Sequence, residues 1–218
     1  MGWLAIINLP IYIVSGQALV YLWTMVNPSA LNHLILNPYA VLQRGEYWRL
    51  FTTLFVGPVG NTTFNFVTNP IITVFYLYLL YIYGEALEHE WGSFGFTLFY
   101  LVGAIGTMAA TFLGAYAAGT YGPGAFYLNL TIFLAFAALN PDFIIQLFFI
   151  FPIKIKWLGL FIWVGLVYEF LTSSFVNRVA ILAAVGNYFL FLSKMHFEQG
   201  KEIIRLYQHK QKFRNWKG

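Results

Sequence analysis

One acidic side chain, Glu169, lies within a long apolar stretch of the chain. Burying an ionisable group in a lipid bilayer is costly, so such a residue is a functional candidate by default. We expect it to contact a polar or basic residue of a bound protein segment; alternatively, it pairs with Arg178 or Arg49, or reaches the outer interface. Asn129 and Asn187 are two further candidates for such binding, unless they simply bond between helices.

The sequence offers little material for hydrolytic chemistry. A serine nucleophile needs a base within hydrogen-bond reach, but all four histidines lie outside the long apolar stretches: His33, His89, His196 and His209. No serine occurs between Ser93 and Ser173, and there is no cysteine. The pair His89–Glu90 lacks the second histidine of a helical zinc motif, and an aspartyl pair would need a second carboxylate in the apolar stretches. We therefore expect no catalytic residue, no metal and no cofactor.

The composition indicates that these residues belong to a membrane protein. Hydrophobic residues make up 60% of the chain and charged residues 9%, whereas soluble domains carry about 25% charged residues. So few charges could not cover the surface of a soluble fold, but a lipid bilayer removes that requirement. We expect the bilayer itself to be a partner, with tyrosine and tryptophan favouring its headgroup zone.

Apolar stretches of about 20 residues, the length that crosses a bilayer as a helix, recur along the chain. The predicted spans are residues 4–25, 65–84, 95–117, 124–140, 157–175 and 178–193. Residues 27–64 hold turn signals such as Gly57–Pro58 and are predicted to form a long structured outer loop, partly in the interface. A short polar link, 85–93, follows the second span. Residues 143–153 are apolar but too short to cross, and are predicted to be an interfacial or re-entrant piece.

Basic residues concentrate toward the end of the chain. Seven of the 12 lie from Lys194 onward, and Lys154 and Lys156 follow the short apolar piece. Because positive residues favour the cytoplasmic side, six spans are predicted to place both termini in the cytoplasm. The chain then divides into a transmembrane domain, 1–193, and a basic cytoplasmic tail, 194–218. We expect the tail to bind anionic lipid, at about 1 kcal/mol per charge, and not nucleic acid.

Three local motifs resemble those of the rhomboid family. Residues 46–49, Glu–Tyr–Trp–Arg, resemble the tryptophan–arginine motif of the rhomboid first loop. Residues 84–94 resemble the pattern joining its helices 2 and 3, and residues 151–158 resemble the link between its helices 4 and 5. The resemblance extends over roughly residues 10–193. It implies an all-α, polytopic bundle of six transmembrane helices with a large outer first loop and a short fourth helix.

Three residues of these motifs have structural roles that their chemistry also supports. Trp48 can anchor at the lipid headgroups. Arg49 can donate hydrogen bonds to phosphate or to loop carbonyls. Glu88 can accept backbone N–H bonds from the start of a helix.

The chain departs from the pattern that active rhomboids share, a serine at the start of helix 4 and a histidine on helix 6. By the resemblance, Pro123 takes the serine position and Ile181 the histidine position. The histidine and asparagine that assist the oxyanion on helix 2 would fall near Ile72 and Tyr76. The resemblance therefore implies a pseudoprotease, similar to Derlin-type proteins, without the catalytic Ser/His dyad.

We predict a non-catalytic rhomboid-like membrane protein that binds transmembrane segments of client proteins, for quality control, retention or escort. Clients would enter between the second and fifth spans, where Glu169 would line a water-filled cavity. One alternative is an intramembrane serine protease of the rhomboid family with a divergent active site. A small transporter or channel is another, although the sequence shows no paired charges and no inverted repeat of broken helices.

Overall fold

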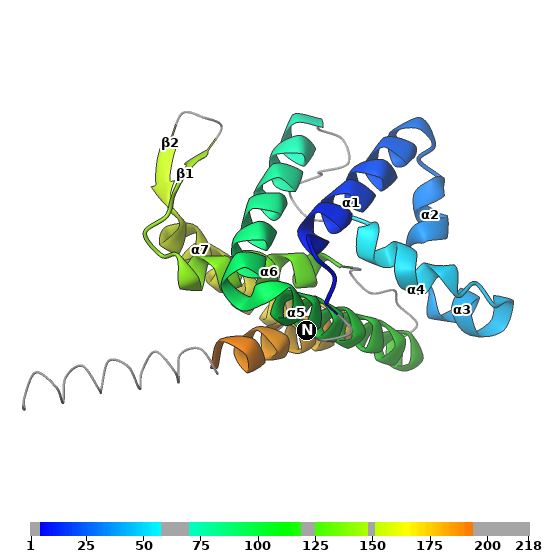
Figure 1. The fold of residues 1–218 in the computed structure, drawn as a ribbon. Helices are drawn as coiled ribbons and strands as arrows, with labels where there is room; N and C mark the ends of the chain where they lie inside the picture. The colour runs from blue at the N-terminus through cyan, green and yellow to red at the C-terminus, as the bar shows by residue number, and fades with distance from the viewer. Residues whose placement is uncertain (1–4, 58–69, 119–124, 148–150, 194–218) are drawn as a thin grey trace, which may run out of the picture.

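The computed structural model describes residues 5–57, 70–118, 125–147 and 151–193, and these residues are mostly helical (Figure 1). Among them, four helices are long and apolar enough to cross a membrane: α1 (Leu9–Val26), α5 (Pro70–Ala118), α7 (Ile155–Thr172) and the last helix (Phe175–Ser193). A shorter apolar helix, α6 (Phe126–Leu139), precedes α7. The helical class and the apolar helices expected from the composition are confirmed. The predicted basic tail, 194–218, lies outside the described residues.

α1 differs from the predicted first span, 4–25, at its start. The helix begins at Leu9 and continues to Val26, so Pro10 lies in its first turn. Proline suits this position because its missing N–H has no helical partner there and its fixed φ matches the helix. Asn8, with a φ of 58°, leads the chain into the helix in the left-handed conformation.

The predicted long loop, 27–64, is largely helical where it is described. It contains three short helices and one 3-10 turn: α2 (Ala30–Leu34), α3 (Pro38–Arg44), α4 (Trp48–Thr52) and η1 (Thr53–Phe55). Asn37 begins α3 by accepting a 3.1 Å hydrogen bond from the backbone N–H of Ala40. Gly45 ends α3 with a φ of 70°, a conformation that glycine adopts readily.

α5 is bent at Gly92, whose φ of 73° and ψ of 159° are not helical. Figure 1 shows the two limbs on either side of the bend running in different directions. The polar link predicted at 85–93 is therefore wrong in extent, because residues 85–91 continue the first limb as helix. Their glutamate, alanine and leucine residues favour helix, and only the glycine readily adopts the conformation of the bend.

A β-hairpin occupies the piece, 143–153, that was predicted to be interfacial or re-entrant. Strand β1 (Ile144–Leu147) pairs antiparallel with β2 (Phe151–Lys154). Pairing satisfies backbone N–H and C=O groups that an unpaired apolar segment would leave without partners. In Figure 1 the hairpin projects from the α6–α7 end of the molecule.

α6 is the most enclosed of these helices. Nine of its 14 residues are buried, because it packs against both α5 and α7. The first limb of α5 also packs against α1, where a Cβ at Gly84 would lie 2.8 Å from Pro10. The first limb of α5, α6 and α7 thus form the part of the core on which the candidate site is built.

The last helix lies close against the second limb of α5. A Cβ at Gly114 would lie 2.4 Å from Val176, and one at Gly106 would lie 3.4 Å from Ala183. Positions increase along one helix as they decrease along the other, so the two are antiparallel. Small residues allow such close backbone approach between membrane helices.

Candidate functional site

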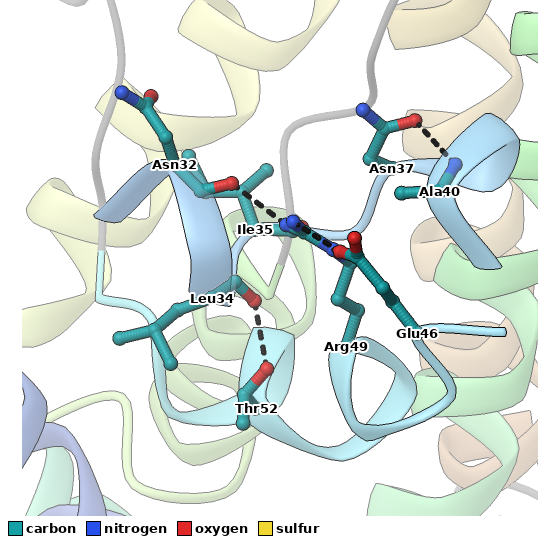
Figure 2. A network of polar contacts seen from close by, with 8 residues as sticks. All are labelled: Asn32, Leu34, Ile35, Asn37, Ala40, Glu46, Arg49 and Thr52. Atoms are coloured by element: carbon teal, nitrogen blue, oxygen red, sulfur yellow. Dashed lines mark hydrogen bonds and ion pairs between the residues drawn. The ribbon is translucent and has the colours of Figure 1, made fainter. Parts of the chain in front are cut away.

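Arg49 of the tryptophan–arginine motif connects separate parts of the first loop by hydrogen bonds. Arg49 is 4% exposed, and its Nη1 donates to the carbonyl oxygens of Asn32 at 2.7 Å and Ile35 at 3.0 Å. Its Nε donates to Oε2 of Glu46 at 2.6 Å (Figure 2). Of the two kinds of partner expected, phosphate and loop carbonyls, Arg49 has the second. Trp48 is 53% exposed, and its anchoring at headgroups stays a prediction.

Glu88 joins the start of α1 to the bend of α5. Its Oε1 accepts a 2.8 Å hydrogen bond from the backbone N–H of Asn8, the residue that precedes α1. The same oxygen accepts a 2.6 Å bond from the Ser93 hydroxyl, directly after Gly92. Glu88 therefore accepts a backbone N–H at a helix start, as its chemistry suggested, and it also stabilises the bend.

Among the described residues, Glu169 is hydrogen-bonded to a tyrosine and not to an arginine. Its Oε1 accepts a 2.7 Å bond from the hydroxyl of Tyr127 on α6. Arg49 is held in the first loop, and Arg178 donates to the carbonyl oxygens of Leu171 and Ser173 at the end of α7. The two arginine partners considered for Glu169 are therefore engaged elsewhere. The role of Glu169 in client binding stays a prediction.

Asn187 bonds between helices, one of the two roles considered for it. It is 3% exposed, and its Nδ2 donates a 3.0 Å hydrogen bond to the carbonyl oxygen of Phe99 on α5. Ile181 lies on the same helix, at the position that the resemblance assigns to the rhomboid histidine. Its side chain is part of the buried apolar core of the protein. Pro123, at the serine position, lies outside the described residues.

A cavity of about 210 Å³ lies between the first limb of α5, α6 and α7. Its lining is apolar apart from two tyrosines and one asparagine: Tyr76, Leu79, Leu80, Tyr83, Phe126, Asn129, Leu130, Phe133, Leu158 and Ile162. These are the helices in which the second, fourth and fifth spans were predicted. Glu169, which was expected to line a cavity here, is not among the lining residues.

Asn129 is the polar centre of this cavity. It is 4% exposed, and its Nδ2 donates a 2.9 Å hydrogen bond to the hydroxyl of Tyr76. Its Oδ1 is buried and has no hydrogen-bond partner in the described part of the chain. The cavity thus combines one amide and two tyrosines with an otherwise apolar lining, which suits binding better than acid–base chemistry.

Sequence reasoning named Asn129 but did not recognise Tyr76 or Tyr83 as site residues. The signal was present in their spacing, because positions 76, 79, 80 and 83 share one face of a helix. Positions 126, 129, 130 and 133 repeat that spacing on α6. Nothing in the spacing, however, says which two faces meet.

A second cavity, of about 220 Å³, lies between α5 and the β-hairpin. Ile144, Ile145 and Gln146 of β1 line one side of it. Leu79 and Tyr83 line both cavities, so this part of α5 separates the two spaces.

The base of the hairpin is held by an ion-pair cluster. The Asp142 carboxylate accepts hydrogen bonds from Nζ of Lys154 at 3.0 Å and Nζ of Lys156 at 3.3 Å. These bonds, the one from Lys154 first, lower the pKa of the Asp142 carboxyl below its ordinary value. All three side chains are well exposed.

In the described part of the chain, neither Ser93 nor Ser173 forms the hydrogen bond to a histidine that a divergent dyad would need. The Ser93 hydroxyl donates to Glu88 and not to nearby His89. The Ser173 hydroxyl is buried without a partner among the described residues, so His33 does not reach it there. Within the same residues, no group of three His, Cys, Asp or Glu side chains is placed to hold a metal ion.

Comparison of the sequence with known proteins identifies no relative of this chain. No protein-family model matches the chain, and no curated protein matches its sequence.

Proposed function

We propose that this chain is a non-catalytic, multi-pass membrane protein of rhomboid-like architecture that binds transmembrane segments of client proteins. Retention, escort or quality control of membrane proteins would follow from such binding. The cavity between α5, α6 and α7 is the observation that carries the proposal. A mostly apolar cavity with one buried amide can bind an apolar segment, and the amide can fix the position of that segment through a single polar contact.

In the proposed arrangement, the chain crosses the membrane six times. The two limbs of α5, separated by the bend at Gly92, would cross separately, and α6 would be the short fourth span. A 14-residue helix is about 21 Å long, less than the roughly 30 Å of the hydrocarbon layer. Such a helix would thin the bilayer around it and so ease the approach of a client helix. Both termini, with the basic tail on anionic lipid, would lie in the cytoplasm.

Photo-cross-linking from two adjacent residues of α7 tests the proposal. Ile162 lines the cavity, whereas Phe161 is 74% exposed and would face lipid. With a photoreactive residue at either position in the full chain, we expect client capture in cells from position 162 only. Mass spectrometry should place the cross-linked residue within a transmembrane segment of the captured protein.

Equal capture from both positions would indicate random collision in the membrane and contradict the proposal. The absence of catalysis is tested separately. A fluorophosphonate probe that labels any serine, or cleavage of a reporter transmembrane substrate, would favour the alternative of a protease with a divergent active site.

A further inference from the structure

The hydrogen bonding of Asn129 is incomplete. Its Nδ2 is occupied by the Tyr76 hydroxyl, whereas its buried Oδ1 has no partner among the described residues. Buried polar atoms in proteins are nearly always hydrogen-bonded, because an unsatisfied one is destabilising. An amide oxygen can only accept, so an N–H or O–H group must complete the site.

The rest of the lining does not supply that group. Apart from Tyr76, whose hydroxyl already accepts from Asn129, the one lining residue with a hydroxyl is Tyr83. The Tyr83 hydroxyl is itself buried and unpartnered within the described residues. The remaining lining side chains are leucine, isoleucine and phenylalanine, which have no donor. A hydrogen-bond donor to Oδ1 of Asn129 would therefore have to be supplied by a molecule bound in the cavity.

We propose that the cavity selects client segments that carry one hydrogen-bond donor, such as a serine hydroxyl, within their apolar stretch. The donor bonds to Oδ1 of Asn129. This inference rests on the proposed function, because it names the chemistry of the segment that the cavity takes. At about 210 Å³ the cavity is far smaller than a helix about 10 Å across. The client therefore lies across the opening and inserts only the donor side chain and a neighbour.

The test uses the full chain in phosphatidylcholine vesicles, with a photoreactive residue at position 162. Two synthetic peptides differ in one residue: each has an apolar run of about 20 leucines and alanines, flanked by lysines, with a central serine in one and alanine in the other. We expect capture of the serine peptide to be on the order of threefold to tenfold higher, as one interhelical hydrogen bond in a membrane gives. Asn129→Leu should remove the difference. Thr131→Val should keep it: this matched control removes a buried polar group of α6 that does not line the cavity.

Equal capture of the two peptides by the unmodified chain would overturn the preference and leave client binding in place. Capture of neither peptide would count against the proposed function, and against the preference with it. A serine preference that persists in a folded Asn129→Leu variant would place the acceptor elsewhere and overturn the assignment. Should Asn129→Leu fail to fold, the two peptides still decide the matter on the unmodified chain.

Discussion

The hydroxyl of Tyr127 on α6 donates a 2.7 Å hydrogen bond to Oε1 of Glu169 on α7. Tyr127 is 1% exposed, whereas Glu169 is half-buried. The bond thus links the enclosed helix of the core to a carboxylate nearer the surface of α7. The hydrogen bond from the phenol fixes the position of the Glu169 carboxyl group.

Glu169→Gln separates the hydrogen bond from the charge. The glutamine carbonyl can still accept from Tyr127, so we expect unchanged helix content and thermal unfolding midpoint. The negative charge is lost, and we expect cross-linking to clients from position 162 to fall by about tenfold, equivalent to about 1.4 kcal/mol. Tyr127→Phe is the control, because it keeps the charge and removes a bond worth about 1 kcal/mol of stability. Unchanged capture in Glu169→Gln would leave the carboxylate a structural role only.

Arg49 should be needed for the stability of the first loop. Arg49→Ala leaves Glu46 and two backbone carbonyls without their buried donor, so we expect a loss of about 3 kcal/mol in the free energy of unfolding. Thermal unfolding in detergent micelles measures it. Arg44→Ala is the matched control: Arg44 is exposed and contacts the ring of Tyr39 at 5.9 Å, worth about 0.5–1 kcal/mol. Similar losses in both variants would refute the buried network.

The contact between Gly114 and Val176 predicts that α5 tolerates no side chain there. An added Cβ would lie 2.4 Å from both methyl groups of Val176, a stiff and fully buried side chain. We expect Gly114→Ala to cost about 1–3 kcal/mol of stability through overpacking. At Gly186 a Cβ meets nothing within 4 Å, so Gly186→Ala should be neutral or stabilising. Micelle unfolding of both variants checks the pair, and a neutral Gly114→Ala would show that the helices are not so closely packed.

Apolar length predicted most of the helices but not where each one begins or bends. The predicted first span, 4–25, began five residues too early, because apolar residues precede the helix as well; Pro10, whose backbone chemistry suits a first turn, lies close to the true start at Leu9. The glutamates of 85–91 suggested a link, whereas their helix propensity kept α5 intact as far as Gly92. Charge and hydropathy describe the environment of a segment, and backbone propensity decides its local conformation.

The hairpin and the contacts between helices could not be predicted from the sequence, for a different reason. Two four-residue strands in a short apolar run show no period that separates strand from helix. The pairing of Tyr127 with Glu169, and of Asn129 with Tyr76, depends on how α6 is rotated about its own axis. Packing against α5 and α7 sets that rotation, and a uniformly apolar helix such as α6 carries almost no pattern from which to read it.

The ion-pair cluster at the base of the hairpin predicts how the Asp142 carboxyl titrates. Because the hydrogen bonds from Lys154 and Lys156 lower the pKa of this carboxyl, its charged form is favoured in the folded chain. Its contribution to stability is therefore complete above the ordinary aspartate range, near pH 3.9, and is lost as the pH falls through the lowered pKa. Carboxyl carbon-13 shifts of the chain in micelles report the titration directly.

We expect Lys154→Met to raise the pKa of Asp142 more than Lys156→Met does, because the Lys154 bond is the shorter, 3.0 Å against 3.3 Å. High salt should weaken both effects at these exposed side chains, and a midpoint at or above the ordinary value in the unmodified chain would show that the cluster does not form.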